Sequence, residues 1–216
     1  MIRRKASYEK ELYVIFDKLE LMCKHIEAAI EKSVTALVTR DTEPAKAVCE
    51  YEKKADKLER KIEKACLKLL IMEQPVARDF REVSAILKMI TDLERIGDQA
   101  WDIAKITMNF RNDEYTKKLD HIPKMADIVI QMVKDGVLAF INRDLELAQS
   151  IEQADDKADE LFNFAVADLI SDIKKNPENA EQNINLLLIT KYLERIGDHA
   201  VNVGEWVEYA ITGKRK

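Results

Sequence analysis

The sequence is poor in residues that break helices and in residues that build disulfide frameworks. Among 216 residues there are only five glycines, four prolines and three cysteines, Cys23, Cys49 and Cys66. So few turn-forming residues argue against a many-stranded fold and favour long helices. An odd number of cysteines without C-x-x-C spacing argues against a disulfide framework and a thiolate zinc site, so we expect a reducing, cytoplasmic location.

The chain also lacks a long apolar run and an excess of positive charge. The stretch LLLI at 186–189 is about the longest strongly apolar run, and acidic residues interrupt the basic N-terminus before a signal-peptide core develops. We therefore expect a protein that is neither secreted nor membrane-spanning. The 35 basic and 40 acidic residues are mixed along the chain with a net charge of −5, which argues against nucleic acid as a partner.

What remains is 47% apolar and 35% charged residues, arranged in segments of helical length. The sparse breakers predict helices near 7–40, 44–73, 76–110, 123–142, 145–174 and 179–212. Apolar residues such as Leu186, Ile189, Leu193 and Ile196 alternate steps of three and four, which indicates one buried stripe per helix. Long helices joined by short turns predict an all-α protein built of antiparallel bundles.

The two halves of the chain repeat one another. The hexapeptide LERIGD occurs at 93–98 and again at 193–198, and Arg40 and Asp41 in the first half correspond to Arg143 and Asp144 in the second. We therefore expect two tandem, pseudo-repeated three-helix bundles, residues 1–112 and 113–216.

Acidic residues four positions apart form a pair on each of four predicted helices. The pairs are Glu52 and Asp56, Glu94 and Asp98, Asp155 and Asp159, and Glu194 and Asp198; Asp102 and Asn202 lie one further turn along. Like charges at this spacing repel by a few tenths of a kcal/mol, so helix stability alone does not account for them.

The turn positions bring these pairs together. Pro75 is the midpoint between Asp56 and Glu94, and equally between Glu52 and Asp98, and the corresponding midpoint in the second half falls at the other predicted turn. Each hairpin should then place four carboxylates side by side. An all-oxygen site suits hard cations such as Mg²⁺, Mn²⁺, Ca²⁺ or Fe³⁺, so we expect two multi-carboxylate metal sites, one per bundle.

A solvated surface is the alternative reading of these carboxylates. Basic neighbours would then neutralise them: Arg95, Arg195, Lys53, Lys54 and Lys157. Gly97 and Gly197, which are costly inside a helix, indicate close helix approach or clearance beside the carboxylates.

Two other classes of protein also remain open. A ferritin-like carboxylate protein would use Glu-x-x-His, which does not occur here, and a purely structural helical scaffold would need no site at all. The chain has no nucleotide-binding or nucleophile-elbow motif, so we predict no catalytic residue and no enzyme.

The stretches DLERIGDQA at 92–100 and YLERIGDHA at 192–200, preceded by EKKAD at 52–56 and DDKAD at 155–159, resemble the PhoU family of phosphate-signalling regulators. The resemblance covers nearly the whole chain. It implies tandem three-helix bundles whose E(D)xxxD motifs, here the four acidic pairs, carry metal ions or a multinuclear cluster of iron, zinc, manganese or magnesium.

The resemblance also implies a cytoplasmic adaptor between the Pst phosphate transporter and a membrane sensor histidine kinase. Such a protein is a negative regulator, damping phosphate uptake and the starvation response when phosphate is plentiful. We expect the protein to form a homodimer.

Overall fold

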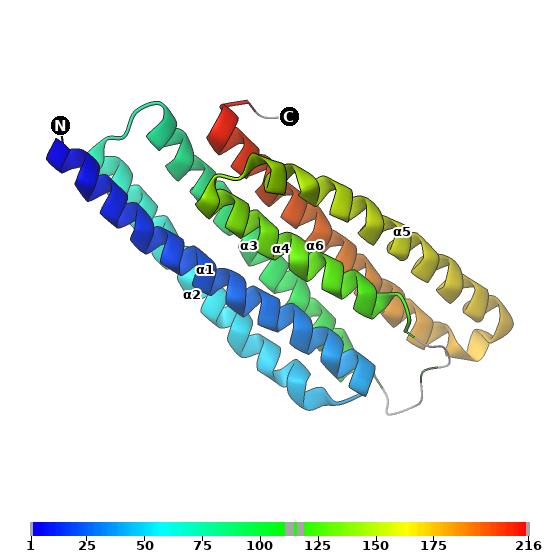
Figure 1. Ribbon diagram of the computed structural model, residues 1–216. Coiled ribbons are helices and arrows are strands. Elements are labelled where there is room, and N and C mark those ends of the chain that lie inside the picture. Colours follow the sequence, from blue (N-terminus) through cyan, green and yellow to red (C-terminus); the bar gives the residue numbers. More distant parts are fainter. Residues whose placement is uncertain (1, 111–114, 116–118, 215–216) are drawn as a thin grey trace.

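A computed structural model describes residues 2–110, 115 and 119–214, with side chains from Ser7 onward. These residues form long antiparallel helices and no strand (Figure 1). The elements are α1 (Ile2–Thr39), α2 (Thr42–Glu73), α3 (Arg78–Met108), α4 (Ile122–Asn142), α5 (Leu145–Lys175), a short 3-10 turn η1 (Pro177–Asn179) and α6 (Ala180–Thr212). The predicted all-α class is confirmed, whereas the predicted boundary between residues 112 and 113 lies outside the described residues.

Local sequence explains where α2 and α5 begin. Asp41 and Asp144 cap α2 and α5 by accepting hydrogen bonds from the backbone N–H groups of Glu43 and Leu147. The α2–α3 turn contains Pro75, as predicted, but α3 begins two residues later than expected because Ala77 has a φ of 48°, which a helix cannot include.

The first helix also differs from its prediction. It begins at Ile2 instead of near residue 7, because the intervening arginine, lysine and alanine residues are good helix formers and no breaker separates them from the rest of α1.

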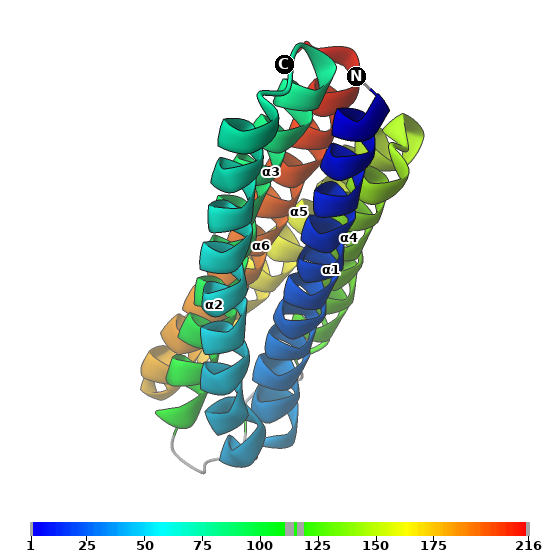
Figure 2. The same ribbon diagram turned by 90° about the vertical axis from the view of Figure 1, so that its left-hand side faces the viewer.

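Helices α1, α2 and α3 pack together as one bundle, and α4, α5 and α6 as a second. The bundles are joined where α3 packs against α6 and α1 against α4, which leaves α2 and α5 as the outer helices (Figures 1 and 2). One continuous apolar core runs through both bundles and includes the predicted stripe residues Leu93, Ile96, Leu193 and Ile196, all fully buried. The predicted tandem three-helix bundles are confirmed.

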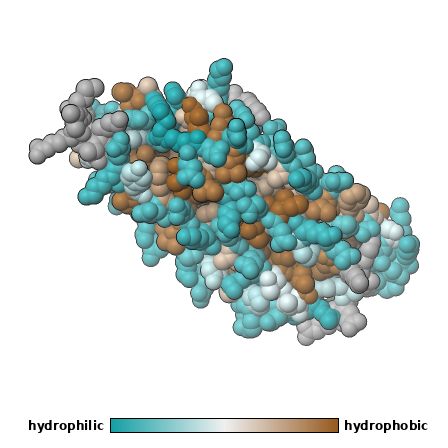
Figure 3. Space-filling model, viewed as in Figure 1, coloured by the Kyte–Doolittle hydropathy of each residue, from teal (hydrophilic) through white to brown (hydrophobic). Residues whose placement is uncertain are grey.

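Both termini lie at one end of the molecule, together with the α2–α3 and α4–α5 turns (Figure 1). On the face crossed by α1 and α4, apolar side chains show between polar ones (Figure 3). Over the described part of the chain, no helix combines the length and apolarity that a membrane crossing requires.

Candidate metal centre

The α2–α3 hairpin brings three predicted site residues together. One carboxylate oxygen from each of Glu52, Asp56 and Asp98 lies within 4.8 Å of the other two. Glu52 and Asp56 stand one turn apart on α2, and Asp98 reaches them from α3. The turn at Pro75 therefore sets Glu52 and Asp98 at the same height, as the spacing predicts.

Glu94 and Asp102 flank this group on α3. The Arg95 guanidinium bridges Glu94 and Asp98, at 3.4 Å and 3.2 Å from their carboxylates, while Lys105 pairs with Asp102 at 2.5 Å. Arg95 was expected as a neutralising neighbour. Lys105 was not, although its i, i+3 spacing from Asp102 in the sequence is the signal for such a pair.

Asp56 has a basic partner on its own helix as well. Arg60 lies 3.2 Å from the Asp56 carboxylate, with three quarters of its own side chain exposed. Because the guanidinium groups of Arg60 and Arg95 approach from the solvent side and are largely exposed, they neutralise the cluster only in part.

The first cluster is electrostatically unfavourable in the absence of a further cation. Burial and the neighbouring carboxylates of Asp56 and Asp98 raise the pKa of Glu52, and burial together with Asp98 raises the pKa of Glu94. Burial also raises the pKa of Asp98 in spite of the nearby Arg95. A bound cation would relieve this repulsion by stabilising the ionised form of each carboxylate.

The α5–α6 hairpin repeats the arrangement, but its Asp159 and Asp198 side chains are exposed, whereas the four acids of the first hairpin are half-buried. Burial, followed by the charges of Asp159 and Asp198, raises the pKa of Asp155 to about 6. Burial and Glu194 raise the pKa of Asp159 and of Asp198, so all four acidic groups interact. Lys191 pairs with Glu194 at 2.5 Å and partly offsets their charge.

The two LERIGD glycines differ in what surrounds them. A Cβ at Gly197 would stand 2.6 Å from the Oδ1 atom of Asp155, so this glycine gives the carboxylate the clearance that the sequence predicts. A Cβ at Gly97 would meet Ala55 at an ordinary 4.0 Å. Of the two glycines, Gly197 of the second hairpin is therefore the one that makes room for a carboxylate.

Asn202 points away from the acidic cluster of its hairpin. Its side-chain amide donates to Asp92 of α3 at 3.2 Å, and Asp92 is also contacted by His199 and by the indole N–H of Trp206. Asp92 is not among the residues that the sequence patterns predict. One feature of the sequence marks this residue: Asp92 directly precedes the first LERIGD, whereas Tyr192 precedes the second.

The first cluster fits a hard metal ion. Two ligands that each lie 2.0–2.6 Å from one cation stand at most about 5 Å apart, which the observed spacing of up to 4.8 Å satisfies. All three donors are carboxylates, a set that suits Mg²⁺, Mn²⁺, Ca²⁺ or iron better than thiolate-seeking metals. Glu52, Asp56 and Asp98 would hold the ion, with Glu94 one turn away.

The structure thus defines a class of protein: a duplicated three-helix bundle with acidic pairs facing each other across the hairpin of each repeat. The model of the PhoU domain matches this chain twice, at residues 19–107 and 122–207. The chain therefore belongs to the PhoU family, as its motifs predict.

Individual relatives agree with this assignment. The chain is 34% identical to the phosphate-specific transport system accessory protein PhoU homolog of Borreliella burgdorferi, covering 100% of this chain and 98% of that protein. It is 32% identical to the homolog of the same name from Clostridium acetobutylicum, covering 96% and 95%.

Two crystal structures have the same fold. PhoU from Pseudomonas aeruginosa superposes with a TM-score of 0.91 at 30% identity, covering 96% of this chain and 100% of that one. The phosphate transport system regulatory protein PhoU from Streptococcus pneumoniae gives 0.89 at 25% identity, covering 97% and 99%. The family consists of regulatory accessory proteins, which agrees with the expectation that this protein is not an enzyme.

Proposed function

We propose that this protein is a metal-binding, cytoplasmic regulator of phosphate uptake. Membership of the PhoU family makes it an accessory protein of phosphate transport. The observation that carries the metal-binding part is the convergence of Glu52, Asp56 and Asp98 from two helices on one point. A solvated surface would not require acidic pairs on both arms of a hairpin to face each other.

The proposed ligands form two sets. The first is Glu52, Asp56, Glu94 and Asp98, and the second is Asp155, Asp159, Glu194 and Asp198. Asp102 would join the first set by releasing Lys105, and Asn202 would join the second by releasing Asp92. The first site should be occupied at lower metal concentration, because three of its donor oxygens are already within reach of one ion.

We further propose that the protein acts as a negative regulator, an adaptor between the Pst phosphate transporter and a sensor histidine kinase at the inner face of the membrane. Support comes from relatives of nearly equal length that are named accessory proteins of the phosphate-specific transport system. The names of these relatives favour a regulator over a ferritin-like protein. A homodimer remains part of the proposal, and light scattering during gel filtration would test it.

Metal binding is tested by mass spectrometry of protein purified without chelator. The variant Glu52→Gln/Asp98→Asn should lose the metal of the first site, and Asp155→Asn/Asp198→Asn that of the second, with each variant still helical by circular dichroism. The matched control is Glu50→Gln/Asp127→Asn, which changes two exposed acids outside the clusters. A parent protein that takes up no iron, manganese, zinc or magnesium on titration would leave the clusters as solvated surface.

The regulatory role is tested in a strain lacking the protein. Phosphate uptake and a starvation-responsive reporter should both rise in phosphate-rich medium, and the parent chain should restore them. If neither changes, the negative-regulator assignment is wrong regardless of whether the protein binds metal. Restoration by the metal-free variants would show that the metal is dispensable for regulation.

A further inference from the structure

The outward side of α2 is strongly basic in a protein whose net charge is −5. Between residues 53 and 68, six exposed basic residues occupy one side of the helix, which we call the basic stripe: Lys53, Lys57, Arg60, Lys61, Lys64 and Lys68. At 3.6 residues per turn they fall within a sector of about 100°, and the buried residues Ala55 and Ile62 lie on the far side of the helix. Asp56 and Glu63 lie beyond one edge of this sector.

Most of this charge faces solvent. Of the six basic residues, Arg60 pairs with Asp56 at 3.2 Å and Lys68 with Glu11 of α1 at a loose 3.9 Å. Both pairs are exposed and contribute little to stability. The stripe extends along the helix for about 22 Å.

The fold itself does not require this charge, as the second repeat shows. Helix α5 is the outer helix of its bundle, as α2 is of the first. Its residues at the equivalent positions are Asp156, Glu160, Asn163, Phe164, Ala167 and Ser171. None of them is basic, so the same architecture folds without a basic outer helix.

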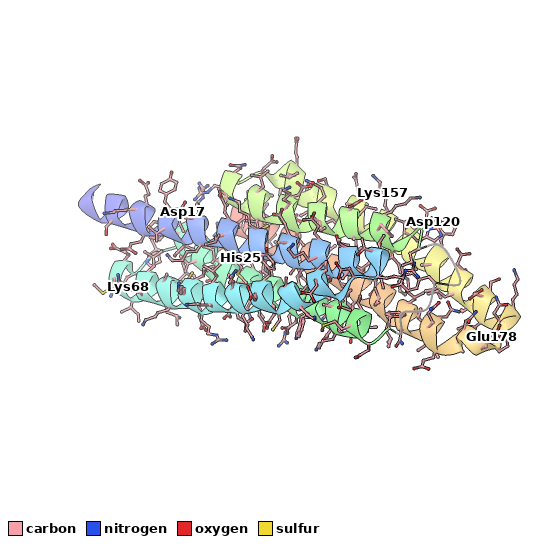
Figure 4. The ribbon with its side chains drawn as sticks, turned by 90° about the horizontal axis from the view of Figure 1, so that it is seen from below. Asp17, His25, Lys68, Asp120, Lys157 and Glu178 are labelled. Atoms are coloured by element: carbon pink, nitrogen blue, oxygen red, sulfur yellow. The ribbon has the colours of Figure 1, made fainter. Side chains whose placement is uncertain are left out.

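The basic stripe leads directly to exposed apolar residues. Ile71 and Met72 at the end of α2 and Val76 in the following turn are 73%, 65% and 76% exposed, with Leu67 and Phe80 exposed beside them. We call these five residues the apolar tip. It lies at the end of the molecule that carries both termini, near Lys68 (Figures 1 and 4).

We propose that the basic stripe and the apolar tip together bind the surface of a bilayer that contains anionic phospholipid. Lipid phosphates complement the lysines along α2, and the boundary between head groups and acyl chains accepts the side chains of Ile71, Met72 and Val76. Nucleic acid would account for the charge but not for the apolar residues. The tip is a projecting turn that inserts into a soft surface, and this contact needs no metal.

Sedimentation with lipid vesicles tests the proposal. The protein should bind vesicles of phosphatidylcholine mixed with phosphatidylglycerol, bind phosphatidylcholine alone far more weakly, and dissociate as salt is added. Each lysine near an anionic surface strengthens binding by about five-fold. Charge reversal by Lys57→Glu/Lys61→Glu/Lys64→Glu/Lys68→Glu should therefore weaken binding by at least about 100-fold.

A matched control separates the stripe from net charge. Lys24→Glu/Lys88→Glu/Lys124→Glu/Lys174→Glu changes the net charge by the same amount at exposed helical positions elsewhere. This variant should retain most of the binding. Equal loss in both charge-reversed proteins would overturn the assignment of the site to α2.

The apolar tip is tested separately. Ile71→Ser/Met72→Ser/Val76→Ser should weaken vesicle binding by about ten-fold or more while leaving its salt dependence unchanged. Ile184→Ser/Leu188→Ser, at exposed positions on α6, should have no effect. Failure to bind anionic vesicles at low ionic strength, or binding of duplex DNA in their place, would overturn the proposal.

Discussion

The Nδ1 atom of His199 on α6 lies 2.9 Å from the Oδ1 atom of Asp92 on α3, across the interface between the two bundles. Asn202 and Trp206 contact the same carboxylate, so one α3 side chain receives three partners from α6. Only 15% of the Asp92 side chain is exposed. Most of its hydrogen-bonding capacity is therefore satisfied inside the interface, between the two helices that also carry Glu94 and Asp198.

Replacing Asp92 should weaken the attachment of the two bundles. Asp92→Ala leaves the side chains of Asn202 and Trp206 without their shared acceptor, which costs about 2 kcal/mol. For a chain of this size, thermal melting should shift down by roughly 4–8 °C. Asp17→Ala, at an exposed position on α1 (Figure 4), is the control and should melt within about one degree of the parent. Equal melting of both variants would contradict this role of Asp92.

The two LERIGD glycines should respond to the same substitution to different degrees. Gly97→Ala places its methyl group in ordinary contact with Ala55 and should stabilise the protein by about 0.5–1 kcal/mol, since alanine favours a helix. Gly197→Ala instead displaces the carboxylate of Asp155. It should show less stabilisation and a reduced affinity for metal at the second site, measured by denaturation and by metal titration.

The metal-free protein should become less stable as the pH rises from about 4 to 6. Because the pKa of Asp155 in the folded protein is about 6, against an ordinary value of 3.8, the folded state binds more protons than the unfolded state in this window. The contribution is about 1 kcal/mol after solvent screening, since the group is only partly buried. Asp155→Asn should flatten this part of the stability curve, and an unchanged slope would argue against the assignment to Asp155.

Arg40 and Arg143 are equivalent in the two repeats, and both have a positive φ, 57° and 55°, at the end of a helix. Arg143 pairs with a buried acid, Glu82, at 2.7 Å. Arg40→Gly should stabilise the protein by about 0.5–1 kcal/mol because glycine adopts this conformation freely. Arg143→Gly should destabilise it by about 2 kcal/mol, because Glu82 loses its basic partner. Chemical denaturation of both variants measures the difference.

Much of the fold could be predicted from periodicity and breakers. The spacing of Leu93, Ile96, Leu193 and Ile196 identifies residues that are fully buried in the structure. The start of α3 could not be predicted to the residue, because the positive φ of Ala77 depends on how the turn closes between two packed helices.

The candidate site shows the same division. Spacing alone predicted that Glu52 and Asp98 would meet, because both arms of a hairpin have the same rise per residue from a turn at Pro75. It did not predict that Asp159 and Asp198 of the second cluster would be exposed. Nor did it predict the ion pairs of Arg60 with Asp56, Lys105 with Asp102 and Lys191 with Glu194.

The sequence by itself determined the all-α fold class, the duplication and the facing acidic pairs, because these depend on local spacing along each helix. The tertiary structure decided which side chains meet across bundles. Asn202 was expected beside Asp198 but bonds to Asp92, because the packing angle of α3 on α6 sets which residues from distant parts of the chain come within reach. No periodicity within one helix contains that angle.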